Sequence, residues 1–126
     1  MKQLSAANIS NLRARKIDIY ATIIIAFAIG LATLTPVEKL PTGSGSDKLC
    51  HLISFAIFTL PIAIIRPKAM WVILSLSIAY GGAIEIIQPF VNRNCEMADL
   101  FADSCGAVLG ILAGKLLLSK IRLSAN

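Results

Sequence analysis

Residues 20–34 read YATIIIAFAIGLATL, and residues 70–84 read MWVILSLSIAYGGAI. Both stretches are apolar or small around almost the whole circumference of a helix. A helix in a soluble bundle needs a polar face that recurs about every 3.6 residues, so these stretches disfavour a water-soluble bundle. A lipid bilayer is the solvent that they fit, because a helix inside it exposes side chains to hydrocarbon.

The composition of the whole chain favours the same solvent. The 126 residues are 56% hydrophobic and 15% charged, with a mean hydropathy of +0.77, whereas soluble domains are about a quarter charged. A water-soluble chain this short has a large surface that polar residues must cover. The composition therefore disfavours a disordered chain, a soluble nucleic-acid-binding module and a disulfide-rich miniprotein. The length predicts a single domain over residues 1–126.

Four apolar stretches predict an all-α fold, a bundle of four transmembrane helices at about residues 17–34, 48–65, 69–88 and 98–118. Each has close to the ~20 residues that span a bilayer core of about 30 Å. The first is longer than the apolar region of a signal peptide and lacks a small-x-small cleavage site, so we expect an uncleaved helix. Pro61 lies inside the second stretch, where a membrane helix tolerates proline with a kink.

The basic residues predict how these helices are oriented in the membrane. With four spans, nine of the twelve lie on one side: Lys2, Arg13, Arg15, Lys16, Arg66, Lys68, Lys115, Lys120 and Arg122. The other three are Lys39, Lys48 and Arg93. Because basic residues mark cytoplasmic segments, both termini are predicted to be cytoplasmic. Residues 35–46, rich in proline, glycine and serine, predict a flexible external loop, and residues 89–97 predict a second one.

Polar and titratable side chains gather at the external ends of the last three predicted helices. They are Asp47, Lys48, His51, Glu85, Gln88, Arg93, Asp99 and Asp103. His51, Glu85 and Asp103 each lie about one turn, ~5 Å, below a helix end. Because lipid rejects such groups, we expect them to face one another inside the bundle, where ionisable residues are candidates for function.

The residue types in this cluster favour acid-base chemistry beside an anion. His51, Glu85 and Asp103 are the candidate catalytic residues, because an imidazole and carboxylates at low dielectric can exchange protons near neutral pH. Lys48 and Arg93 at the rim could hold an anion such as a lipid phosphate. The candidate ligand-binding set is completed by Asp47, Gln88 and Asp99.

Two other interpretations of the cluster stay open. The carboxylates and His51 could bind a divalent metal, although no HExxH or comparable spacing supports it, so no metal ligand is assigned from the sequence. The same groups could instead form a buried polar cap whose only role is to hold three helices together. The sequence identifies no cofactor.

Small residues recur every four positions in the last predicted helix. They are Ala98, Ala102, Gly106, Gly110 and Gly114. Such a stripe lets another helix backbone approach closely, and Gly81 and Gly82 could supply the partner surface. We expect Gly106, Gly110 and Gly114 to pack inside the bundle, with a homodimer through the stripe as the alternative.

The three cysteines, Cys50, Cys95 and Cys105, cannot form a complete internal set of disulfides, and none has CxxC spacing. Cys50 and Cys95 both lie near the predicted external surface, where a disulfide between them is an alternative to two free thiols. Adjacent helix positions point about 100° apart, so Cys50 and His51 have poor geometry for a nucleophilic pair.

The order and spacing of these polar residues resemble the VanZ-like family over about residues 47–114. The matching pattern is Asp47-Lys48-x-x-His51-x-x-x-Phe55, then Glu85-x-x-Gln88 and Arg93, then Asp99-x-x-x-Asp103-x-x-Gly106-x-x-x-Gly110. Members are small bacterial membrane proteins, and the founding member is associated with resistance to the glycopeptide teicoplanin. The resemblance implies a membrane location and the external cluster. Asn is frequent in the family at the position of Asp103, which weakens any mechanism that needs a carboxylate there.

These features favour an integral membrane protein of the bacterial envelope that binds or modifies a lipid-linked or anionic component at the outer face. Its expected partners are the bilayer and a lipid-linked envelope precursor or anionic lipid, and not nucleic acid. The second class is a non-enzymatic accessory protein whose polar cluster is structural. An ion- or proton-coupled transporter is the third, disfavoured because the first helix has no ionisable residue at mid-membrane.

Overall fold

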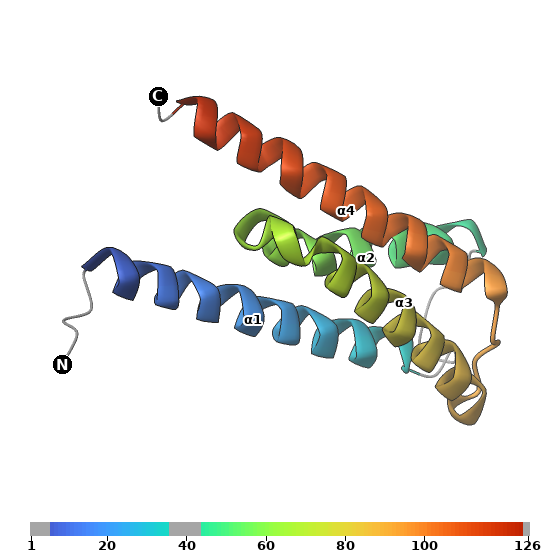
Figure 1. Ribbon diagram of the computed structural model, residues 1–126. Coiled ribbons are helices and arrows are strands. Elements are labelled where there is room, and N and C mark those ends of the chain that lie inside the picture. The colour runs from blue at the N-terminus through green and yellow to red at the C-terminus, as the bar shows by residue number, and fades with distance from the viewer. Residues whose placement is uncertain (1–5, 36–43, 125–126) are drawn as a thin grey trace.

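The computed structural model describes residues 6–35 and 44–124. Its architecture is a bundle of four long helices, α1 (Ala6–Thr33), α2 (Ser44–Ile65), α3 (Met70–Ile87) and α4 (Met97–Ser124) (Figure 1). Two short 3₁₀ helices, η2 (Pro67–Ala69) and η3 (Gln88–Val91), connect α2 to α3 and follow α3. The described part of the chain contains no strand, which confirms the predicted all-α fold.

Each long helix contains a segment that is long and apolar enough to cross a membrane. These segments are Lys16–Thr33, Asp47–Ile65, Pro67–Val91 and Met97–Ile121. Large apolar side chains on them point away from the bundle, and Phe27 and Trp71 are 68% and 69% exposed. Such a surface is unfavourable in water and suits hydrocarbon. The chain is a multi-pass membrane protein.

Three helix boundaries differ from the prediction. Helix α1 begins at Ala6 and α4 ends at Ser124, so both extend well past the apolar stretches. The flanking residues are mostly good helix formers, and helical hydrogen bonding does not stop where the hydrocarbon ends. Residues 44–46, predicted as part of a loop, form the start of α2, where Asp47 in the first turn complements the helix dipole. The predicted flexible loop otherwise lies at residues 36–43, outside the described residues.

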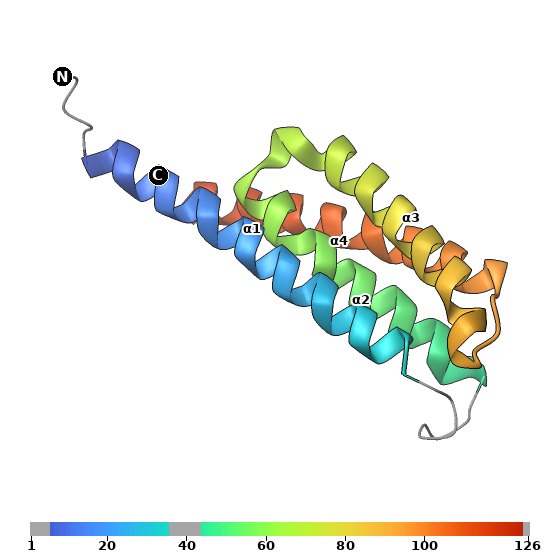
Figure 2. The same ribbon diagram turned by 90° about the horizontal axis from the view of Figure 1, so that it is seen from below.

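Helix α2 packs against all three other helices, and α4 also packs against α3 (Figures 1 and 2). The glycine stripe of α4 makes the α2–α4 contact close. A Cβ atom at Gly106 would overlap the carbonyl of Leu52, and one at Gly110 would overlap the carbonyl of Ala56. A Cβ at Gly114 would lie 2.6 Å from the Cβ of Ala63. The stripe therefore faces α2 within one chain.

The predicted partner of the stripe was wrong, because Gly81 and Gly82 of α3 do not face these glycines. A Cβ at Gly81 would lie 2.7 Å from Asp103 Oδ2, whereas a Cβ at Gly82 would meet nothing within 4 Å. Gly81 thus makes room for the Asp103 carboxylate. Helix rotation about its own axis decides such pairings, and sequence spacing alone leaves that rotation open.

Aromatic rings fill the middle of the bundle. The ring of Phe55 lies 5.9 Å from that of Phe58 and 6.1 Å from that of Tyr80, measured between centroids. The Tyr80 hydroxyl donates a hydrogen bond of 2.6 Å to the carbonyl of Ala26, which ties α3 to α1. Gly30 lets that hydroxyl approach, since a Cβ there would lie 2.9 Å from it.

The two ends of the bundle differ in what they contain. The start of α1 and the end of α4 lie at one end, together with the turn from α2 to α3 (Figure 1). The start of α2, the end of α3 and the start of α4 lie at the other. The polar cluster predicted from the sequence belongs to this second end.

Candidate functional site

The candidate site lies where the first turns of α2 and α4 meet the last turn of α3. Close packing of Gly106 against the backbone of Leu52 brings α4 onto α2 beside His51. Asp103, about one turn earlier on α4, thereby comes within contact distance of His51. Five of the predicted members are almost completely buried there: His51, Glu85, Gln88, Asp99 and Asp103. Polar side chains from α2, α3 and α4 thus converge, as the sequence predicts.

His51 and Asp103 form the innermost pair. His51 Nδ1 lies 2.8 Å from Asp103 Oδ1, and the two residues are 3% and 0% exposed. A carboxylate beside Nδ1 favours the proton on that nitrogen, so Nδ1–H donates to Asp103. The other ring nitrogen, Nε2, has no hydrogen-bond partner among the described residues. A buried imidazole held at one nitrogen and open at the other is arranged to meet a proton, a ligand or a metal ion.

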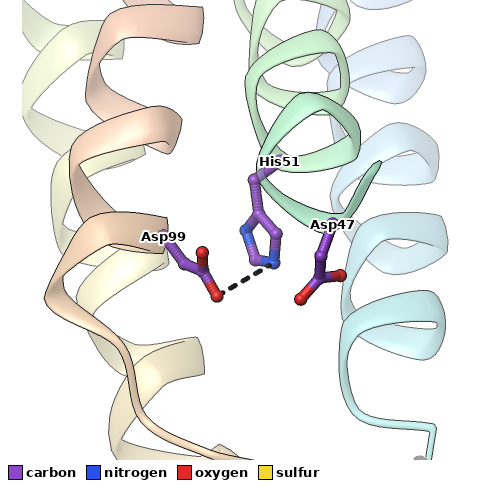
Figure 3. A group of neighbouring side chains, drawn as sticks. All are labelled: Asp47, His51 and Asp99. Atoms are coloured by element: carbon purple, nitrogen blue, oxygen red, sulfur yellow. Dashed lines mark ion pairs between the residues drawn. The ribbon is translucent and has the colours of Figure 1, made fainter. Parts of the chain in front are cut away.

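The open nitrogen of His51 faces two more carboxylates (Figure 3). Asp99 Oδ2 lies 4.0 Å from Nε2, and Asp47 stands beside the ring one turn earlier on α2. One ligand atom from each of Asp47, His51 and Asp99 can be chosen so that all three lie within 4.8 Å of one another. The same holds for His51, Glu85 and Asp103, so the imidazole is shared by two groups.

The two rim cations are paired with carboxylates. Lys48 Nζ donates to Glu96 Oε2 at 2.7 Å and to Asp99 Oδ1 at 3.3 Å. Arg93 donates to the Asp47 carboxylate at 3.3 and 3.4 Å, and its side chain is only 8% exposed. The hydrogen bond from Lys48 lowers the pKa of the Glu96 carboxyl from its ordinary value. Of the two cations predicted to hold an anion, Lys48 is the more accessible, with its side chain 41% exposed.

Glu85 and Gln88 hold the connection between α3 and α4 beside the site. Glu85 Oε2 accepts a hydrogen bond of 2.8 Å from the backbone N–H of Glu96. Gln88 is 1% exposed, and its amide, oriented to satisfy its neighbours, donates to Glu85 Oε2 at 3.2 Å and to the Asn94 carbonyl at 3.1 Å. Glu85, predicted as catalytic, therefore also fixes the connection between α3 and α4.

Sequence reasoning missed a buried ion pair at the opposite end of the bundle. Asp18 is 0% exposed, and Arg66 reaches its two oxygens at 2.6 Å from Nε and 3.2 Å from a terminal nitrogen. The pair ties the start of the α1 span to the end of α2. An available signal was the position of Asp18 inside the first apolar stretch, where an unpaired carboxylate is costly.

All three cysteines are free thiols. Cys50 and Cys95 are exposed, and Cys105 is partly buried. No Cys50–Cys95 bridge is present, and the site contains no thiol among its buried groups.

Comparison with known proteins agrees with the resemblance seen in the sequence. The family model described as VanZ/LLP1 matches residues 5–118, about nine-tenths of the chain. No curated protein and no solved structure matches the chain. The family match confirms the resemblance to VanZ-like proteins and extends it through α1, which the quoted motifs do not reach.

Proposed function

Because the chain belongs to the VanZ/LLP1 family, we propose that it binds or modifies a lipid-linked or anionic component of the cell envelope. The proposal places it in the bacterial cytoplasmic membrane, with both termini in the cytoplasm and the cluster at the outer face. The uneven distribution of basic residues, nine against three, supports this orientation. The family's association with glycopeptide resistance supports an envelope role and is not carried over to this chain.

The observation that carries the proposal is the His51–Asp103 pair. It lies in a helix bundle, about two turns below the starts of α2 and α4, with Nε2 unpartnered among the described residues. A positioned histidine whose second nitrogen is open can accept or donate one proton near neutral pH. Asp103 acts as the positioning residue, since it accepts the hydrogen bond from Nδ1 and fixes the tautomer.

The depth of the site supports a ligand that is itself attached to lipid. Residues about two turns, ~10 Å, below a helix end lie on the headgroup side of the bilayer, toward which the polar part of an anchored lipid is presented. Lys48 at the rim offers a half-exposed ammonium group toward such a headgroup. An anionic ligand would compete with Glu96 for Lys48, because the two are joined by a short ion pair at the surface.

Two other functional classes fit the structure less well. A purely structural cluster would leave no reason for a buried ring nitrogen without a partner, since buried polar groups are normally satisfied. A proton-coupled transporter would need a polar path from the cluster to the Asp18–Arg66 end. Phe55, Phe58 and Tyr80 pack against one another between those ends, which disfavours such a path.

Lipidomics of complemented deletion strains tests the proposed function. A deletion strain should accumulate or lose a lipid-linked envelope species, and the wild-type chain should restore the pattern. His51→Gln should fail to restore it at equal protein abundance, because the amide cannot exchange a proton as imidazole does.

Cys50→Ser supplies the matched control, because Cys50 is the neighbouring residue on α2 and is exposed. It should restore the pattern fully. Complete restoration by both His51→Gln and Glu85→Gln would contradict a binding or catalytic role for the cluster.

A further inference from the structure

We propose that Asp47, His51 and Asp99 bind one divalent cation of the first transition series. The ligands would be His51 Nε2 and one carboxylate oxygen from each aspartate, all on the open side of the imidazole (Figure 3). This site shares the open nitrogen of His51 with the proposed function, so a bound metal would replace proton exchange at Nε2. Metal binding itself requires no envelope substrate and is tested separately. It also goes beyond the sequence, which carries no metal-binding motif.

The unpartnered nitrogen of His51 is the first reason. The residue is 3% exposed, and Nε2 has neither a donor nor an acceptor among the described residues. With Nδ1–H donating to Asp103, Nε2 carries a lone pair directed toward Asp47 and Asp99. A lone pair facing two carboxylates is repelled by them unless a cation or a proton lies between. A metal ion at that point satisfies all three groups at once.

The charge balance of the site is the second reason. Five carboxylates surround the imidazole and its rim: Asp47, Glu85, Glu96, Asp99 and Asp103. Among the basic side chains that the structure describes, those of Lys48 and Arg93 are paired with them at this end. Three of the carboxylates, those of Glu85, Asp99 and Asp103, are at most 3% exposed. Buried charges of one sign are unstable without compensation, and a divalent cation supplies two positive charges.

Each proposed ligand is also held by a second residue. Asp103 accepts from Nδ1 of His51, Lys48 donates to Oδ1 of Asp99, and Arg93 donates to Asp47. Because Lys48 bonds Oδ1 of Asp99, Oδ2 remains available to a metal, and it lies 4.0 Å from His51 Nε2. Metal-ligating histidines and carboxylates are generally oriented by partners of this kind. A cluster held only by chance contacts would not orient its ligand atoms toward one point.

The distances allow binding after a small contraction. The three candidate atoms lie within 4.8 Å of one another, whereas neighbouring ligands of a bound cation, each ~2.1 Å from it, are roughly 3–3.5 Å apart. The carboxylates must therefore approach by about 1 Å. The side chain of Asp47 is 46% exposed, and its two hydrogen bonds from Arg93 are long, at 3.3 and 3.4 Å. Rotation of its carboxylate, with those bonds rearranged, can supply much of that movement.

The donor set indicates which cations fit. One imidazole nitrogen with two carboxylate oxygens suits Mn²⁺, Fe²⁺ or Zn²⁺, whereas Mg²⁺ and Ca²⁺ prefer oxygen ligands throughout. Three protein ligands leave coordination positions for water or a substrate oxygen. We expect Mn²⁺ and Zn²⁺ to compete for the site and Mg²⁺ to bind weakly.

Electron paramagnetic resonance of Mn²⁺ tests the site on the purified full-length protein in lipid nanodiscs, with an affinity tag that contains no histidine. The signal of free Mn²⁺ should fall as one ion per chain is bound, and Zn²⁺ should restore it. Asp99→Asn should weaken binding by about tenfold or more, because a neutral amide replaces a charged ligand. Glu96→Gln removes a nearby carboxylate that is not a ligand and should change affinity by less than about threefold.

A second measurement does not depend on whether a variant folds. His51 is the single histidine of the chain, so nitrogen modulation from imidazole in the pulsed spectrum of bound Mn²⁺ can arise from His51 alone. We expect that modulation in the wild-type protein. Its absence, the absence of Mn²⁺ and Zn²⁺ binding, or equal weakening by Asp99→Asn and Glu96→Gln would overturn the proposal.

Discussion

At the scale of single residues, the chain places an aspartate on each side of its one histidine. Asp103 contacts Nδ1 at 2.8 Å, and Asp99 lies 4.0 Å from Nε2. The two aspartates are four positions apart on α4, so one helix face supplies both. The ring is therefore held at Nδ1 and open at Nε2. The proposed envelope function and the proposed metal site both use Nε2.

Substitution of Asp103 separates its role as an acceptor from its charge. Asp103→Ala should lower the free energy of unfolding by about 1–3 kcal/mol, because it leaves the buried Nδ1–H of His51 without a partner. Asp103→Asn keeps an oxygen acceptor of the same shape and should lose less. Thermal unfolding in one detergent measures both. Equal losses for Ala and Asn would contradict an acceptor role.

At the scale of helices, the contact between α2 and α4 depends on an absence of side chains. Gly106 and Gly110 place the α4 backbone against carbonyl groups of α2. Close approach of this kind replaces the hydrophobic effect as a source of helix association in lipid. The same contact sets the depth at which His51 and Asp103 meet, so packing and site geometry are coupled.

Alanine substitution at two glycines tests this coupling. Gly106→Ala should destabilise the bundle by about 1–3 kcal/mol, because the added methyl group overlaps the carbonyl of Leu52. Gly82→Ala is the matched control, since a Cβ at Gly82 meets nothing within 4 Å. It should be neutral or slightly stabilising, as alanine favours a helix over glycine. Thermal unfolding in detergent compares the two. A larger loss at Gly82 would contradict the assigned contact.

A homodimer through the glycine stripe would have to use a surface that α2 covers. Gly106, Gly110 and Gly114 all face α2 in one chain. The outward faces of α1 and α3 instead carry large apolar side chains such as Phe27 and Trp71. These faces suit contact with lipid chains, as do the outward faces of α2 and α4, which carry side chains such as Ile57 and Phe101.

At the scale of the whole molecule, the polar groups are sorted to the two ends of an apolar bundle. The cluster around His51 occupies one end, and the Asp18–Arg66 pair occupies the other. Phe55, Phe58 and Tyr80 lie between them. Because α1 and α4 carry the two termini at the Asp18 end, the position of either terminus determines on which side of the membrane the cluster lies.

Native cysteines provide the topology test. Cys95 is exposed and lies outside the spans, between Val91 and Met97. With Cys50 and Cys105 replaced by serine, a membrane-impermeant maleimide should label Cys95 in intact spheroplasts. A Ser124→Cys probe at the other end, beyond the last span and in a chain without other cysteines, should be labelled only after the membrane is opened. The reverse pattern would place the cluster on the cytoplasmic side and exclude an outer-face role.

Sequence alone determined the solvent, the helices and the members of the cluster. Hydropathy is a local property, so stretches such as residues 20–34 predict spans without reference to neighbours. The i, i+4 spacing of Asp47 with His51 and of Asp99 with Asp103 places each pair on one helix face. The family resemblance rests on the same local spacings and is confirmed over residues 5–118.

Only the tertiary structure decided which side chains and which helix faces contact one another. It paired Lys48 and Arg93 with carboxylates, joined Asp103 to one nitrogen of His51, placed the glycines against α2, and joined Asp18 to Arg66. These pairings depend on how each helix is rotated about its axis and which neighbour it packs against. Both depend on the packing contacts among all four helices, and no single stretch of sequence specifies those contacts.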